Sequence, residues 1–131
     1  MVNFTTGTFE NFGSCAFLNN GKIELIVTLD VGPRIISCSL CGKPNIFFVD
    51  KERTFKNDSD ELHSFFGTGE NWYIYGGHRL WSSPEKYPAS YVPDNFPVAY
   101  DFDGNKLTLT ANPTITGEKH SVEIMLSESA A

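Results

Sequence analysis

Apolar and polar residues alternate with a period of two along most of the chain. The alternation is clearest in KIELIVTL (residues 22–29), RIISCSL (34–40), KLTLTA (106–111) and SVEIML (121–126). Because every second side chain of a strand lies on the same face, these segments predict half-buried strands of antiparallel sheets with one face toward solvent. Over the whole chain, the pattern predicts strands at residues 8–12, 14–19, 22–29, 34–40, 45–49, 78–82, 97–102, 106–111 and 121–127.

Turn residues separate the predicted strands. Asn-Gly in NNGK (19–22) and Asp-Gly in FDGN (102–105) predict two β-hairpins, because these pairs supply the positive φ angles of primed turns. The one helix that the sequence favours is a short one in DSDELHSFF (58–66), capped by Asp58 or Ser59. We therefore expect an all-β fold, an antiparallel β-sandwich or part of one, with residues 1–131 in a single domain.

Two long segments depart from the alternation. Residues 50–75 and 82–97 carry no strand pattern, and the second segment is rich in proline. Loops of this length in a compact domain are uncommon unless they carry function or are partly disordered. They flank YGGHRLWSSPE (75–85), which is the candidate functional segment.

Charge and hydropathy narrow the classes of function. The chain has 131 residues and a net charge of -6, which argues against binding to nucleic acid, where clustered lysine and arginine supply most of the affinity. No apolar run approaches the roughly 20 residues that span a bilayer, and the first residues lack the basic end and apolar segment of a secretory signal. We expect a cytoplasmic protein without a membrane partner.

Cys38 and Cys41 form a CxxC motif, which raises the possibility of a zinc site. A structural zinc site needs four ligands, and the chain offers one further cysteine, Cys15, and no second CxxC. Buried, reduced thiols are the preferred interpretation, and we expect neither a metal nor a cofactor. The other candidate ligands are three histidines that lie far apart in the sequence, His63, His78 and His120.

The residues of YGGHRLWSSPE have both structural and chemical uses. Gly76 and Gly77 let the backbone approach another chain or a ligand closely, or form an ordinary turn or bulge. His78 is either structural or a proton donor, and Arg79 either binds a ligand or forms a surface ion pair. Glu85 is either a site carboxylate or a solvated loop residue. The residue types alone leave these alternatives open.

Alternation limits which of these side chains share a pocket. In a strand over residues 78–82, His78 and Leu80 share one face while Arg79 and Trp81 share the other. Leu80 predicts that the His78 face is at least partly buried. Aromatic rings with a few polar groups suit sugars, whose C–H faces stack on rings while their hydroxyls meet fixed donors and acceptors. The rings nearby belong to Trp72, Tyr73, Tyr75 and Trp81.

Two segments resemble a known superfamily. YGGHRLWSSPEKYPASYVPDN (75–95) is similar to the Gly-Gly-His-Arg-x-Trp-x-x-Pro-Glu segment of uncharacterised galactose mutarotase-like, or aldose 1-epimerase-like, proteins. LDVGPRIISCSLCGKPNIFF (29–48) resembles a strand pattern near the start of such proteins, and it is the less specific of the two. The resemblance implies a β-supersandwich, of which this chain would be the N-terminal portion.

The resemblance also implies roles for residues. Characterised members interconvert the anomers of free sugars without a metal or cofactor, using a proton donor and a carboxylate base. By resemblance His78 is the proton donor and Arg34 or Arg79 the arginine that contacts the sugar, although the family's first histidine precedes the glycine pair. The family's base comes from its C-terminal half, and no glutamate here lies in a similar context; Glu70 and Glu85 are the acids close to the motif, and Glu85 is our candidate. Together with the aromatic residues, the predicted sugar-binding residues are Arg34, Trp72, Tyr75, Arg79 and Trp81.

Two functional alternatives follow. One is an aldose 1-epimerase-like isomerase, catalytically incomplete as this chain, and the other is a carbohydrate-binding or assembly module without turnover. A third reading is a structural β-domain without a ligand. The sequence leaves open which sugar is bound and whether Arg34 or Arg79 faces it. We also expect a homodimer or larger assembly, because an exposed face carrying Leu107 and Leu109 and a terminal strand at 122–126 would recruit other strands.

Overall fold

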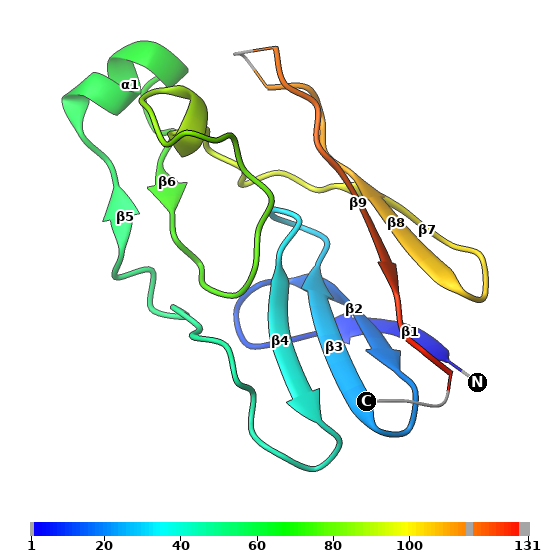
Figure 1. The fold of residues 1–131 in the computed structure, drawn as a ribbon. Helices are drawn as coiled ribbons and strands as arrows, with labels where there is room; N and C mark the ends of the chain where they lie inside the picture. The colour runs from blue at the N-terminus through cyan, green and yellow to red at the C-terminus, as the bar shows by residue number, and fades with distance from the viewer. Residues whose placement is uncertain (1, 115–116, 129–131) are drawn as a thin grey trace.

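The computed structural model describes residues 2–114 and 117–128, and these residues form mainly antiparallel strands (Figure 1). The prediction of an antiparallel all-β fold is confirmed. The strands are β1 (Asn3–Thr8), β2 (Ser14–Asn19), β3 (Ile23–Thr28), β4 (Ile35–Leu40), β5 (Lys56–Asn57), β6 (Trp72–Tyr73), β7 (Ala99–Phe102), β8 (Lys106–Thr110) and β9 (Ser121–Met125). The helical elements are α1 (Asp60–Phe66) and the 3-10 helix η1 (Ala89–Tyr91).

The strands form a four-stranded sheet, β1-β2-β3-β4, a three-stranded sheet, β7-β8-β9, and the short pair β5-β6. One apolar core is shared by the two larger sheets, since side chains of β2 and β3 pack with Leu107 and Leu109 of β8 and Ile124 of β9. Leu107 and Leu109 have no exposed surface. The expectation that they lie on an exposed face is therefore wrong, because the second sheet covers them.

The opposite face of the four-stranded sheet is also covered. Cys15, Ile26 and Ile36 from β2, β3 and β4 pack there with Phe12 and Tyr75. Ile26 is the residue that breaks the alternation of its segment, and its burial shows why: both faces of β3 are apolar. The expectation of one face toward solvent is wrong for this sheet, because residues 9–12 and the segment around Tyr75 lie over it.

Both predicted hairpins are present, joining β2 to β3 and β7 to β8. In each turn the side-chain oxygen of Asn20 or Asp103 accepts hydrogen bonds from the next two N–H groups beyond the glycine. Within the Asn-Gly and Asp-Gly pairs only the glycine has a positive φ, 87° at Gly21 and 96° at Gly104. The glycine and the neighbouring side chain close each turn together.

Three predicted strands are wrong. The first strand lies at Asn3–Thr8 rather than 8–12, and residues 45–49 and 78–82 are not ladder strands. Each of the latter two segments meets another through a single bridge, Val49 with Gly76 and His78 with Ile35. Ile46, Phe48 and Leu80 in these segments are 75%, 57% and 48% exposed, so the alternation here does not mark the buried face of a strand.

The short predicted helix is α1, and Ser59 caps it by accepting a hydrogen bond from the Leu62 N–H. Leu62 is its buried residue, and Figure 1 places α1 at the end of the molecule opposite the β2–β3 hairpin. Within the described residues, no helix has the length and apolar composition to cross a bilayer. The three cysteines are free, but Cys41 is exposed and only Cys15 is fully buried, so the prediction of buried thiols is wrong for Cys41.

Candidate functional site

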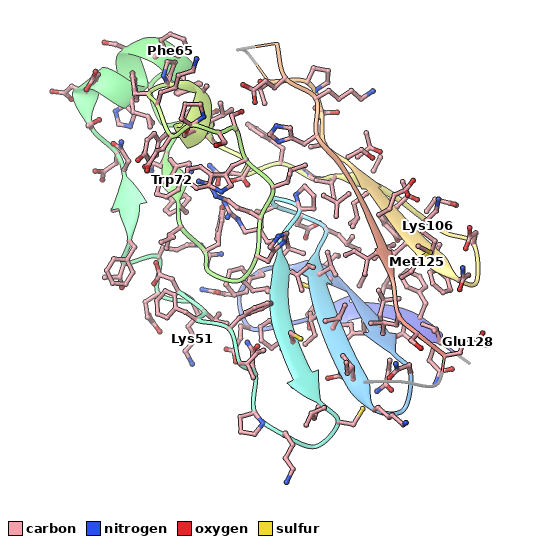
Figure 2. The ribbon with its side chains drawn as sticks, in the orientation of Figure 1. Lys51, Phe65, Trp72, Lys106, Met125 and Glu128 are labelled. Atoms are coloured by element: carbon pink, nitrogen blue, oxygen red, sulfur yellow. The ribbon has the colours of Figure 1, made fainter. Side chains whose placement is uncertain are left out.

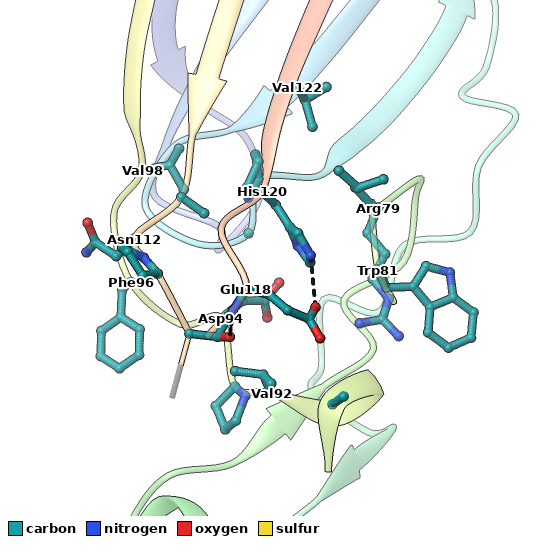
Figure 3. A pocket seen from close by; sticks show the side chains of 18 of the residues that line it. Arg79, Trp81, Val92, Asp94, Phe96, Val98, Asn112, Glu118, His120 and Val122 are labelled. Carbon is teal, nitrogen blue, oxygen red and sulfur yellow. Dashed lines mark hydrogen bonds and ion pairs between the residues drawn. The ribbon is translucent and has the colours of Figure 1, made fainter. Parts of the chain in front are cut away.

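A cavity of about 270 Å³ opens where the long proline-rich segment meets the connection between β8 and β9 (Figure 3). Its wall is formed by four parts of the chain: residues 32–33 between β3 and β4, Phe66 and Glu70 at and after the end of α1, the segment 79–98, and residues from 111–114 and 118–122. Most of the lining is apolar. The chemistry comes from Arg79, Asp94, Asn112, Glu118 and His120.

The Arg79 guanidinium is held between two indole rings at the edge of this cavity. Its Cζ lies 4.5 Å from the centre of the Trp81 ring and 5.2 Å from the centre of the Trp72 ring. One Arg79 nitrogen donates to the Ser90 carbonyl at 3.3 Å. Arg79 and Trp81 line the cavity and Trp72 does not; Figure 2 shows Trp72 on the side of the molecule that carries α1. Both rings lie within the distance of a cation–π contact with Arg79.

A buried ion pair supports the floor of this region. Arg34 is 2% exposed, and its Nη2 donates to both carboxylate oxygens of Asp94, at 3.0 and 3.1 Å, and to the Tyr73 carbonyl at 3.3 Å. The Nε of Arg34 has no hydrogen-bond partner among the described residues. Asp94 lines the cavity and Arg34 does not, so Arg34 acts on the site by holding Asp94.

Tyr75 sits beneath the same region in a rare backbone conformation for a bulky residue, with φ at 55°. Its ring is 2% exposed, and the Arg34 Cζ lies 5.0 Å from the ring centre. Its hydroxyl donates to the Asn95 side chain. Burial, followed by the negative charge of Asp94, raises the Tyr75 pKa to about 12. Tyr75 therefore stays neutral and acts as a structural support.

The glycine pair brings the backbone close to the rest of the chain. Gly76 and Gly77 have φ of 107° and 67°, and a Cβ on either would overlap a carbonyl oxygen, that of Phe48 or Ile35. The Gly77 N–H donates to the Phe48 carbonyl at 2.9 Å. The close approach of these glycines is to other segments of the same chain, a use that the sequence did not predict.

His78 follows the glycines and is fixed through its backbone. Its N–H and carbonyl both pair with Ile35 at 2.9 Å. The His78 side chain is exposed and lies outside the lining of the large cavity. Leu80 is 48% exposed, so the prediction of a partly buried His78 face is wrong. The prediction depended on a strand over residues 78–82, and that strand does not form.

Glu118 and His120 lie on another wall of the cavity and contact each other. The His120 Nε2 is 3.2 Å from a Glu118 carboxylate oxygen, which also accepts a hydrogen bond from the Ser82 hydroxyl. The Ser82 bond and, after it, the His120 bond lower the Glu118 pKa. Figure 3 shows the imidazole and carboxylate side by side, with Arg79 and Trp81 on the other side of the cavity.

Glu85, the other predicted catalytic residue, is exposed and accepts a hydrogen bond from the Tyr91 hydroxyl. It is not among the residues that line the cavity. That hydrogen bond raises the Tyr91 pKa. Glu85 thus lies beside the site and does not face His78 across a bound ring.

The structure brings five of the seven predicted site residues into one region and leaves His78 and Glu85 at its margin. The reasoning from sequence did not place three polar residues of the cavity in the site, namely Asp94, Glu118 and His120. A signal for two of them was present, since Glu118, His120 and Val122 alternate into β9 and all three line the cavity. Among the described residues no cluster of histidine, cysteine and acidic side chains could hold a metal.

Comparison with known proteins gives no further guidance. No family model matches the chain, and no match was found among curated proteins or among solved structures. The residues of the cavity therefore carry the functional argument.

Proposed function

We propose that this chain binds a sugar in the cavity, as the resemblance to galactose mutarotase-like proteins implies. The observation that supports the proposal best is the Arg79 guanidinium held beside Trp81 at the cavity wall. An indole face can stack on the C–H face of a sugar, while guanidinium N–H groups donate to its hydroxyls. A volume of about 270 Å³ lies just below the range of roughly 300–1,000 Å³ of sites for drug-sized ligands, which suits a monosaccharide.

Binding without efficient turnover is the form of the proposal that the geometry favours. Anomer exchange needs a proton donor and a base placed at different atoms of one ring. Glu118 and His120 are bonded to each other on one wall, so they present a single face to a ligand. His78 and Glu85 lie outside the cavity lining. We expect slow anomer exchange at most by this chain.

The proposal extends to fold and setting. The apolar core shared by the two larger sheets supports a β-sandwich, part of a mutarotase-like supersandwich. The three free cysteines fit a reducing cytoplasm.

Tryptophan fluorescence tests binding directly, because both tryptophans of the chain contact Arg79. Titration with galactose or glucose should give a saturable change. Trp81→Ala should weaken the affinity roughly three- to tenfold, as expected for the loss of one stacked ring; because this variant loses part of the signal, its affinity is measured by calorimetry. Phe48→Ala, which removes an exposed ring outside the cavity, is the control. No response to any monosaccharide would contradict the proposal.

Polarimetry separates binding from turnover. Freshly dissolved galactose or glucose should lose its excess optical rotation at nearly the same rate with and without the chain. A large acceleration that Glu118→Gln abolishes would instead support the isomerase alternative.

A further inference from the structure

At the end of the cavity that carries Arg79, the positive and negative charges are equal in number, but only two of them form an ion pair. Arg34 and Arg79 lie there, and the nearby carboxylates are Asp94 and the exposed Glu85. Asp94 already forms the ion pair with Arg34. Arg79 itself forms no ion pair with any described residue. A half-buried guanidinium without a carboxylate partner is unusual, since buried charges are normally paired.

The donors of Arg79 are also largely unused. A guanidinium has five N–H groups, and Arg79 makes one described hydrogen bond, the 3.3 Å contact to the Ser90 carbonyl. Both indole rings lie close to the guanidinium carbon, and they contribute no described hydrogen bond to its N–H groups. Burial and, after it, the charge of Arg34 lower the Arg79 pKa, so an anion at this edge would stabilise the charged form.

Two carboxylates of the cavity, those of Asp94 and Glu118, already have partners within the chain, unlike the guanidinium of Arg79. Asp94 is paired with Arg34, and Glu118 accepts from Ser82 and contacts His120. Glu118 is not among the charges that shift the Arg79 pKa. Glu70 also lines the cavity and forms no ion pair with any described residue. Arg79 is the arginine of the lining, and it lacks an ion-pair partner, whereas the carboxylates can accept hydrogen bonds from hydroxyls.

We propose that the ligand carries a carboxylate, as a hexuronic acid does, and that Arg79 binds this group through the edge of its guanidinium. The inference rests on the sugar-binding proposal and narrows its ligand from sugars to sugar acids. A planar carboxylate matches two parallel N–H groups of a guanidinium. The sugar ring would stack near Trp81, and its hydroxyls would face Glu118 and His120.

Charge also selects a carboxylate over a phosphate. A carboxylate brings one negative charge to one unpaired guanidinium. A phosphate monoester brings nearly two, and the same cavity is lined by Glu70, Asp94 and Glu118. The second charge would meet these carboxylates without a matching cation.

Calorimetric titration at constant ionic strength tests the inference with glucuronate, glucose and glucose 6-phosphate. Glucuronate should bind roughly tenfold or more tightly than glucose, as expected for a charged hydrogen-bonded pair, and glucose 6-phosphate should not exceed glucuronate. Arg79→Gln should remove the preference for glucuronate. Arg79→Lys, which keeps the charge and loses the planar fork, should retain a smaller preference and serves if the glutamine variant fails to fold. Arg53→Gln is the matched control, since Arg53 also stacks on two rings, Phe12 and Tyr75, but does not line the cavity.

The outcomes separate the two proposals. Equal binding of glucose and glucuronate would overturn the inference and leave sugar binding in place, and no binding of any ligand would overturn both. Tighter binding of glucose 6-phosphate than of glucuronate would overturn the assignment of a carboxylate to Arg79. A preference for glucuronate that stays at its full size in the Arg79 variants would also overturn it.

Discussion

Single residues around the candidate site are held in conformations that only their surroundings make stable. Tyr75 has a positive φ although it is bulky, and the two glycines after it also have positive φ. The Tyr75 ring lies under Arg34 and beside Phe12, which fixes it in the second core. The backbone of Gly77 then passes directly against Ile35. This contact fixes the position of the backbone just before Arg79 and Trp81.

Gly77→Ala should destabilise the chain strongly, by about 2 kcal/mol or more, because the new Cβ meets both a positive φ and the Ile35 carbonyl. Gly21→Ala is the matched control: Gly21 has a similar φ of 87° but open space around it. It should cost only about 1 kcal/mol. Urea unfolding measures both values. Equal losses in the free energy of unfolding would show that the close approach at Gly77 does not contribute to the cost of the substitution.

The ion pair between Arg34 and Asp94 is the second residue-level test. Asp94→Asn leaves the 2%-exposed Arg34 charge without a full counter-charge, and we expect a loss of about 2–3 kcal/mol, toward the low end for buried pairs because Asp94 is partly exposed. Glu123→Gln breaks the exposed pair with Lys106 and should cost under about 1 kcal/mol. Chemical denaturation compares them, and similar small losses would contradict a structural role for Asp94.

At the scale of elements, one carboxylate joins two parts of the chain that the sheets do not connect. Glu118 lies in the connection between β8 and β9, and the Ser82 hydroxyl that bonds to it lies in the proline-rich segment. This contact closes one side of the cavity. Because the folded-state pKa of Glu118 is lowered, the contact is fully present above the ordinary value of 4.5 and is lost as the pH falls through the lower folded value.

Hydrogen exchange of the amides in residues 82–90 should therefore rise on acidification from pH 6 to below the folded pKa of Glu118, after correction for the intrinsic rates. In Glu118→Gln the same amides should exchange at one faster rate that changes little with pH. Amides of β2 and β3 provide the internal reference, because these strands form the centre of the four-stranded sheet. Unchanged protection of residues 82–90 in the unaltered chain would contradict the proposed contact.

The sequence predicts best the strands that pair along a continuous ladder of hydrogen bonds, because in them alternate side chains are buried on one face. β3 and β8 show their alternation, and both hairpins carry their turn residues, so these features were predictable. Residues 78–82 alternate equally well, but the backbone pairing described for this segment is that of one residue, His78, with Ile35 of β4. No local pattern encodes such a contact. The same limit applies to Asp94 and Glu118, which reach the cavity only after distant segments have packed.

At the scale of the whole molecule, the two larger sheets leave strand edges open. The strand orders place β1 and β4 at the edges of one sheet and β7 and β9 at the edges of the other. Burial of Leu107 and Leu109 removes the apolar face that was expected to drive assembly, but the edges remain. Met125 on β9 is 61% exposed, and its sulfur accepts a hydrogen bond from the Asn105 side chain at 3.8 Å.

We therefore still expect a homodimer in solution, formed through the β9 edge. Light scattering at tens of micromolar should give about twice the chain mass of 14.6 kDa. Met125→Lys should shift the mass toward the monomer, because a charge on an edge strand opposes pairing. Leu40→Lys, a similar change on the exposed end of β4, is the control. A monomer mass for the unaltered chain would contradict this prediction.

The central claim is that the cavity beside Arg79 and Trp81 binds the ligand. The chain has two tryptophans, so a proton–nitrogen correlation spectrum contains two indole N–H signals, which single Trp→Phe variants assign. Titration with glucuronate should move the Trp81 indole signal and the Ser90–Asp94 amides saturably, while the amides of β1 stay in place. Shifts centred on the exposed His78 and Glu85, or two indole signals that do not move at saturating sugar, would contradict the account.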